Sequence, residues 1–97
     1  MTQPYIDVEK LDSLVGRLKA ISHPDRIAII ELLSRQDKAS VSEIQTHLKL
    51  EQASTSNHLR ILRDNQILTA KRVGKNKYYS LKHAVISGVI DCFNRCV

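Results

Sequence analysis

Small, amide-bearing and cationic side chains recur along one side of the segment from Gln52 to Asn65. At the rotation of about 100° per residue of an α-helix, that side carries Ala53, Ser56, Asn57, Arg60 and Arg63. Small residues permit close approach, an amide matches the edge of a base, and arginine pairs with guanine or phosphate. The pattern predicts a helix that enters the major groove of DNA. The alternative is an ordinary solvated helix face.

A basic hairpin is predicted directly after this helix. Its strands would be 68–73 and 77–81, with a turn at Gly74-Lys75-Asn76 in which Gly and Asn supply positive φ. The residues expected to face the core are Leu68, Val73, Tyr79 and Leu81. From 52 to 81 the single acid is Asp64, against the basic residues Arg60, Arg63, Lys71, Arg72, Lys75 and Lys77. Such an excess of positive charge is typical of a phosphate-binding surface. The alternative is a charged edge that prevents strand-on-strand association.

The preceding segments must hold this helix and hairpin in place. A first helix is predicted from about Asp7 to Ala20, and a second from Pro24 to about Arg35 with Ser22 as its N-cap. Ser40-Val41-Ser42-Glu43 matches a capping box and starts a short third helix. The inward side of the helix after it would carry Thr55, His58, Leu59 and Leu62. The expected fold is mainly α with a small β-hairpin, a winged helix-turn-helix of order α-α-α-α-β-β-α.

Length and charge limit the function classes. The 97 residues predict a single domain over 1–97, and a net charge of +5 favours a polyanionic partner. No apolar run reaches the roughly 20 residues of a membrane span, and no signal peptide is recognisable, so we expect a cytoplasmic protein. Because no nucleophile–base set, Gly-rich phosphate loop or carboxylate pair is evident, we expect no enzyme. RNA binding is disfavoured because few aromatic residues could stack on bases.

Three segments carry a family resemblance: Leu18–Ile27, Gln52–Leu62 and the stretch from Gly74-Lys75 to Tyr78-Tyr79-Ser80-Leu81. In this order they resemble the ArsR-type (ArsR/SmtB) winged-helix repressors over roughly residues 11–97. The resemblance implies a homodimer that binds an inverted-repeat operator in double-stranded DNA and often leaves it when an effector binds. The DNA-contacting residues expected are Gln52, Ser54, Ser56, Asn57, Arg60, Arg63, Arg72, Lys75 and Lys77.

Two positions depart from the family pattern. Asn57 stands where a histidine is usual, although its amide can still read adenine. Gln66 stands where glycine is usual before the hairpin, so we expect Asn65 to form the left-handed cap instead.

Effector binding is less defined by the sequence. Many relatives bind soft metals through cysteines where this chain has Ser40 and Ser42, so that site is absent. His83 and Cys96 align only weakly with a zinc site of other relatives, and no metal or other cofactor is required. Cys92 and Cys96 lie one helical turn apart. They are either packing residues of a dimer seam or a dithiol that senses an oxidant, a persulfide or arsenite.

Apolar residues near both ends of the chain predict the dimer. The first and last helices would carry the stripes Leu11, Leu14 and Leu18, and Val85, Val89, Ile90 and Phe93. Left uncovered, these stripes would form an exposed apolar patch, so the terminal helices are expected to form the seam of a homodimer. The alternative function is a winged-helix protein-interaction or dimerisation module without effector sensing.

Overall fold

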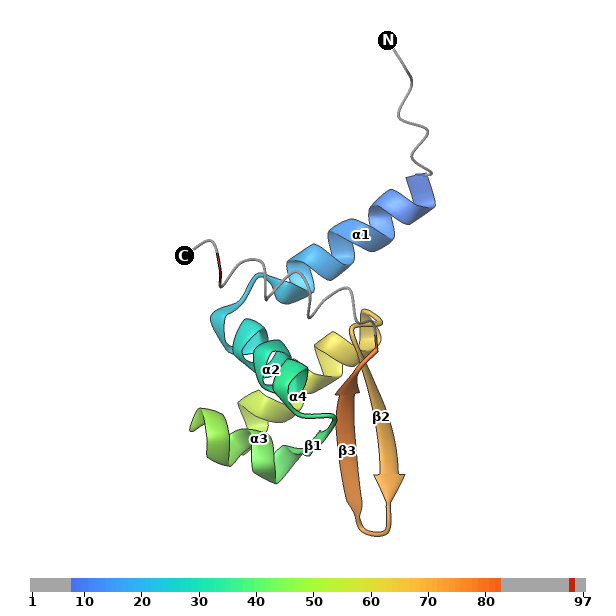
Figure 1. The fold of residues 1–97 in the computed structure, drawn as a ribbon. Coiled ribbons are helices and arrows are strands. Elements are labelled where there is room, and N and C mark those ends of the chain that lie inside the picture. Colours follow the sequence, from blue (N-terminus) through green and yellow to red (C-terminus); the bar gives the residue numbers. More distant parts are fainter. Residues whose placement is uncertain (1–7, 83–94, 96–97) are drawn as a thin grey trace.

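The computed structural model describes residues 8–82 and residue 95, and within this part four helices and three strands are formed (Figure 1). The elements are α1 (Val8–Ile21), α2 (Pro24–Arg35), β1 (Ala39–Ser40), α3 (Val41–Leu48), α4 (Gln52–Asp64), β2 (Leu68–Val73) and β3 (Asn76–Leu81). The predicted order of four helices followed by a hairpin is confirmed. The expected last helix falls on residues outside the described part. No helix of the described residues is long and apolar enough to cross a membrane.

The strands form one antiparallel sheet in the order β1-β3-β2. Strand β1 pairs Ala39 with Tyr79 and Ser40 with Tyr78, so the segment before α3 is tied to the hairpin. Between its second and third predicted helices the sequence indicated no strand, yet Ala39 and Ser40 form β1. A strand of two residues has no alternation that a sequence pattern could display.

Two helix starts are defined by side-chain caps. Helix α3 has the predicted capping box, since the Ser40 hydroxyl accepts from the Glu43 amide at 3.2 Å and the Glu43 carboxylate accepts from the Ser40 amide at 2.8 Å. The bond that the Glu43 carboxylate accepts from the Ser40 amide lowers the pKa of Glu43. The prediction of Ser22 as N-cap of α2 is wrong. The N-cap is His23, whose Nδ1 accepts from the Asp25 amide at 3.1 Å, whereas the Ser22 hydroxyl donates back to Leu18 in α1.

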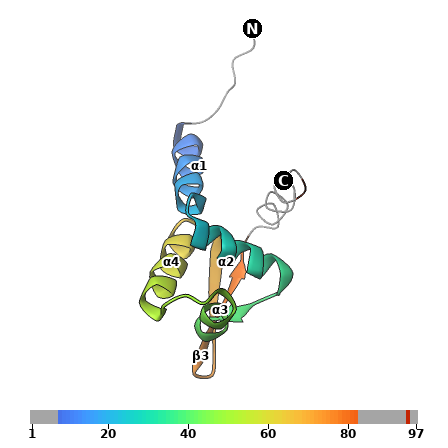
Figure 2. The same cartoon turned by 90° about the vertical axis from the view of Figure 1, so that its left-hand side faces the viewer.

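The hydrophobic core lies between α2, α3, α4 and the base of the hairpin (Figure 2). Its members are all at most 6% exposed: Ala20, Ile29, Ile30, Leu33, Ala39, Ile44, Leu59, Leu62, Ile67, Leu68 and Tyr79. Helix α4 buries Thr55, His58, Leu59 and Leu62, which confirms the predicted inward side. The opposite side of α4 is therefore free to face solvent.

The hairpin alternates between its two faces. Leu68, Ala70 and Tyr79 lie on the face that packs on the helices, and the pairing places Ala70 opposite Tyr79. The expectation that Val73 faces the core is wrong, because Val73 is five residues from Leu68 and so lies on the other face, 48% exposed. Gly74 has φ 63° at the first position of a two-residue turn, so Asn76 belongs to β3 and not to the turn.

The end of α4 corrects a further expectation. Gln66 itself adopts the left-handed conformation with φ 65°, whereas Asn65 has φ −95°. The Ile67 amide donates to the Leu62 carbonyl at 2.9 Å, which closes the helix in the manner of a Schellman motif. Asn65 has a different role, because its side-chain amide donates to the Ile61 carbonyl at 2.8 Å.

Helix α1 projects away from the hairpin tip in both views (Figures 1 and 2). It approaches the end of α4 closely at Gly16, where a Cβ would lie 3.2 Å from the Asn65 side-chain oxygen. Five large apolar residues of α1 are between 40% and 69% exposed: Val8, Leu11, Leu14, Val15 and Leu18. Within the part of the chain that the structure describes, this apolar stripe is not covered.

Candidate nucleic-acid interface

The outer side of α4 presents the residues that the sequence predicts to contact DNA. All six predicted residues of this helix are exposed: Gln52, Ser54, Ser56, Asn57, Arg60 and Arg63. The N-cap Glu51 makes no side-chain cap bond, so the first amides of α4 are not occupied by such a cap. Free amides at a helix N-terminus favour phosphate. This end of α4 thus combines side chains that can hydrogen-bond to base edges with backbone donors.

The polar side chains on the outer side of α4 already contact each other. The Arg60 guanidinium donates to the Asn57 amide oxygen at 2.7 Å and lies 3.6 Å from an Asp64 carboxylate oxygen. Arg63 lies 3.5 Å from the other oxygen of Asp64. Exposed ion pairs of this kind contribute only about 0–1 kcal/mol. They therefore orient both arginines without preventing them from binding another anion.

The hairpin places several cations near its tip. Arg72 pairs directly with Lys77 across the two strands, on the same face as the core but beyond its edge. Like charges at directly opposed positions destabilise a hairpin, and a bound polyanion would relieve the repulsion. Lys75 is exposed in the turn, and the Lys77 ammonium lies 5.6 Å from the Tyr79 ring centre. Arg72, Lys75 and Lys77 thus lie together around the hairpin turn.

Lys38 is a further cation at this surface that sequence reasoning missed. Its ammonium lies 5.2 Å from the centre of the Tyr78 ring, because β1 pairs with β3 and brings the preceding loop onto the hairpin. Lys38 is exposed, so its charge adds to that of the hairpin. No local signal could identify it, since its position depends on strand pairing.

The helix and hairpin lie close enough to act together. Figures 1 and 2 both show the hairpin tip projecting beyond α3 and α4, on the side opposite to α1. The basic hairpin tip and the apolar stripe of α1 therefore lie at opposite ends of the molecule. This arrangement separates a region suited to a polyanion from a region suited to an apolar partner.

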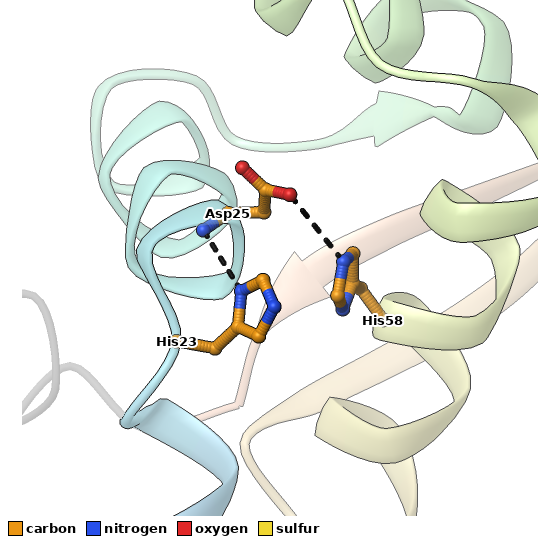
Figure 3. Close-up of side chains that lie close together, drawn as sticks. All are labelled: His23, Asp25 and His58. Atoms are coloured by element: carbon orange, nitrogen blue, oxygen red, sulfur yellow. Dashed lines mark hydrogen bonds and ion pairs between the residues drawn. The ribbon is translucent and has the colours of Figure 1, made fainter.

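A group that the sequence did not connect lies on the inner side of α4. His23, Asp25 and His58 have potential ligand atoms within 4.8 Å of one another (Figure 3). The sequence placed His58 on the inward side of its helix but did not connect it with His23, because the two are far apart along the chain. Ser40, where the sequence excluded a soft-metal site, uses its hydroxyl in the α3 cap. His83, Cys92 and Cys96 lie outside the described residues.

Comparisons with known proteins agree with this geometry. Residues 23–69 match the family described as "Bacterial regulatory protein, arsR family". The chain is 30% identical to the arsenical resistance operon repressor of Staphylococcus aureus over 77 residues, which cover 79% of this chain and 73% of that protein. It is 32% identical to the transcriptional repressor PagR of Bacillus anthracis over 89 residues, which cover 92% of this chain and 89% of PagR.

Solved structures have the same fold. The crystal structure of PagR from Bacillus anthracis superposes with a TM-score of 0.82 at 30% identity, covering 90% of this chain and 99% of that chain. The solution structure of a homodimeric winged helix-turn-helix DNA-binding domain from Mycobacterium bovis gives a TM-score of 0.83. At 21% identity, with 99% of this chain and 88% of that chain covered, the second likeness concerns the fold alone.

Proposed function

The chain belongs to the arsR family of bacterial regulatory proteins, and from this premise we propose that it is a homodimeric repressor of an inverted-repeat operator. Two of the relatives named above, the Staphylococcus aureus protein and PagR, are repressors by name. The observation that carries the proposal for this chain is the exposed Asn57–Arg60 pair on α4 beside a hairpin with like-charged residues at its tip.

The proposed complex has α4 in the major groove. Asn57 reads a base edge through its amide, with Arg60 beside it to bind guanine or a phosphate. Ser54, Ser56 and Gln52 contact the backbone near the first turn of α4, and Arg63 binds a phosphate farther along. Arg72, Lys75, Lys77 and Lys38 contact the backbone or the minor groove from the hairpin. On binding DNA, Arg60 and Arg63 exchange their ion pairs with Asp64 for contacts with the DNA.

The apolar stripe of α1 supports the dimer. Exposed apolar residues at five positions of one helix make a continuous surface that a second copy of the chain can cover. Two copies related by a twofold axis would present two α4 helices, and each would read one half of an inverted repeat. Sedimentation should therefore detect a dimer at micromolar concentration.

An effector that releases the operator is also part of the proposal. Cys92 and Cys96 are the residues suited to it, as a dithiol that reacts with an oxidant, a persulfide or arsenite. Operator release by peroxide, tetrasulfide and arsenite should be compared between the wild type and a Cys92→Ser, Cys96→Ser double variant. Equal responses of the two proteins would assign the cysteines to packing.

The function is tested by selecting the operator. Wild-type protein at pH 7.5 is used to enrich duplexes from a randomised pool, and the enriched sequences are aligned. We expect a twofold-symmetric sequence with half-sites about one helical turn of DNA apart, as for other dimeric helix-turn-helix proteins. A pool that shows no enrichment, or binding that does not depend on sequence, would contradict the proposal.

A further inference from the structure

His58 connects the DNA-reading helix to the start of α2. The residue is 7% exposed, and its Nδ1 accepts from Arg26 Nε at 3.0 Å. Its Nε2 lies 3.6 Å from an Asp25 carboxylate oxygen (Figure 3). The ring of His23 lies beside it, with 4.6 Å between ring centres. Among the described residues, the charged and titratable groups that act on His58 are His23, Asp25 and Arg26, all from α2 and its N-cap.

Arg26 fixes the protonation state of His58. An arginine side chain can only donate hydrogen bonds, so the Nδ1 atom that accepts from it must carry a lone pair. The ring proton is therefore on Nε2, directed toward Asp25. The same guanidinium donates through Nη1 to the Ala20 carbonyl at 3.3 Å, in the last turn of α1. One side chain thus joins α1, α2 and α4, and it does so only while His58 is neutral.

A divalent cation is the other ligand that two imidazoles and a carboxylate suggest. The hydrogen bonds disfavour it. The Nδ1 lone pairs of His23 and His58 are both used by N–H donors, so binding through Nε2 would require protonated Nδ1 atoms facing those donors. Arg26 and the positive end of the α2 dipole add repulsion. The geometry is complete without a metal ion.

We propose that His58 is the positioning residue of the DNA-reading helix, and that it holds α4 against α2 only in its neutral, Nε2-protonated form. The proposal rests on the role of α4 given under Proposed function. Asn57 precedes His58 and Arg60 follows it by two residues, so both project from the same turn of α4 on the outer side. Because base readout depends on hydrogen-bond geometry, a shift of this turn changes what the two residues can contact.

Acidification is the natural way to break this connection. A proton on Nδ1 would face the N–H of Arg26, so that two donors meet and Arg26 loses its acceptor. Burial lowers the pKa of His58, and His23 and Arg26 lower it further, whereas Asp25 opposes them. The unfolded chain therefore takes up the proton first. Stability is complete above the ordinary pKa of about 6.5 and is lost as pH falls from there toward the lower pKa of the folded state.

The free protein provides the first test, by NMR of the histidine ring nitrogens from pH 8 to pH 5. We expect the Nε2–H tautomer at pH 7.5 and titration of His58 below the ordinary histidine pKa of about 6.5. A His58 ring protonated on Nδ1 at pH 7.5, or titrating at or above about pH 6.5, would overturn the proposal. This test needs no DNA, so it stands even if the protein binds none.

The second test follows binding to the enriched duplex and to a scrambled duplex from pH 7.5 to pH 5.5. The variant His58→Gln keeps an acceptor for Arg26 and a donor for Asp25 but cannot titrate in this range. We expect the preference of wild type for the enriched duplex to fall by up to about tenfold per pH unit for each His58 of the dimer, the limit for one proton, and that of His58→Gln to stay level.

The matched control is His47→Gln, because His47 is exposed on α3. This variant should keep the pH profile of wild type. Identical profiles for wild type and His58→Gln would refute the positioning role.

A third test is titration calorimetry with zinc chloride at pH 7.5. Wild type should show no heat of zinc binding that is lost in the His58→Gln variant. If such heat is found, His58 belongs to a cation site and the proposal is wrong. Failure of every protein to bind DNA at pH 7.5 would instead contradict the proposed function.

Discussion

The two sides of α4 are held in opposite ways. On the outer side, Asn57, Arg60 and Arg63 make exposed contacts with one another and with Asp64. On the inner side, Leu59 is fully buried and His58 has a partner for each ring nitrogen. Exposed contacts are exchanged for a ligand at little cost, whereas buried and satisfied groups resist displacement. The proposed DNA contacts thus lie on the weakly held side of α4, and the proposed positioning residue lies on its strongly held side.

Of the substitutions on the two sides of α4, removal of a buried side chain should have the largest effect on the free energy of unfolding. Leu59→Ala deletes apolar volume at a site with no exposure and leaves a cavity, so the free energy of unfolding should fall by about 2–5 kcal/mol. Urea unfolding at fixed protein concentration measures it. The control on the outer side is Ser56→Ala, which should change stability by less than about 0.5 kcal/mol. Similar losses for the two variants would mean that the sides of α4 do not differ as described.

The base-reading residues should show the opposite behaviour. Asn57→Ala and Arg60→Ala should weaken binding to the enriched duplex by about 1–3 kcal/mol for a true base contact, and binding to scrambled DNA much less. Their stability should stay near that of wild type, because both side chains are exposed. Fluorescence anisotropy with both duplexes measures the difference. An equal loss of affinity for both duplexes would mean that Asn57 and Arg60 contact the DNA backbone and do not read bases.

The hairpin cations should act on all DNA alike. Lys75→Ala and Lys77→Ala each remove one cation, so the slope of log affinity against log salt should decrease by about one unit for each phosphate that is no longer bound. The ratio between the enriched and scrambled duplexes should not change. Lys19→Ala, in the last turn of α1 and far from the hairpin tip, is the control with an unchanged slope. A changed ratio for Lys75→Ala would assign it a role in sequence discrimination.

The smallest effect is expected at the end of α4, where neighbouring residues differ in backbone conformation. Gln66→Gly should stabilise the fold by about 1 kcal/mol, since a side chain in the left-handed region costs about that much. Asn65→Gly should destabilise it, because Asn65 has negative φ and its amide bonds the Ile61 carbonyl. Thermal unfolding of the two variants shows directly whether each substitution raises or lowers the stability. Stabilisation by Asn65→Gly would instead indicate that residue 65 is the left-handed cap, as expected from the sequence.

Local features of this fold could be predicted well from the sequence. The capping box at Ser40, the start of α4 and the division of α4 into inner and outer sides follow from residues within a few positions of each other. The exposure of Val73 could also have been predicted. Strand alternation places Val73 on the other face of the hairpin from Leu68, so the expectation assigned it to the wrong face. The N-cap of α2 was displaced by one residue because His23 competes with Ser22 for that role.

The sequence by itself determined which residues share a helix side, where most helices begin, and where positive charge accumulates, because these properties depend on short-range spacing. The tertiary structure decided which distant residues meet. Pairing of β1 with β3 brings Lys38 to the hairpin, and packing of α2 on α4 brings Arg26 to His58, 32 positions away. Such contacts depend on how whole elements pack, and no spacing along the chain encodes that. The neutral state of His58 is for this reason a property of the fold.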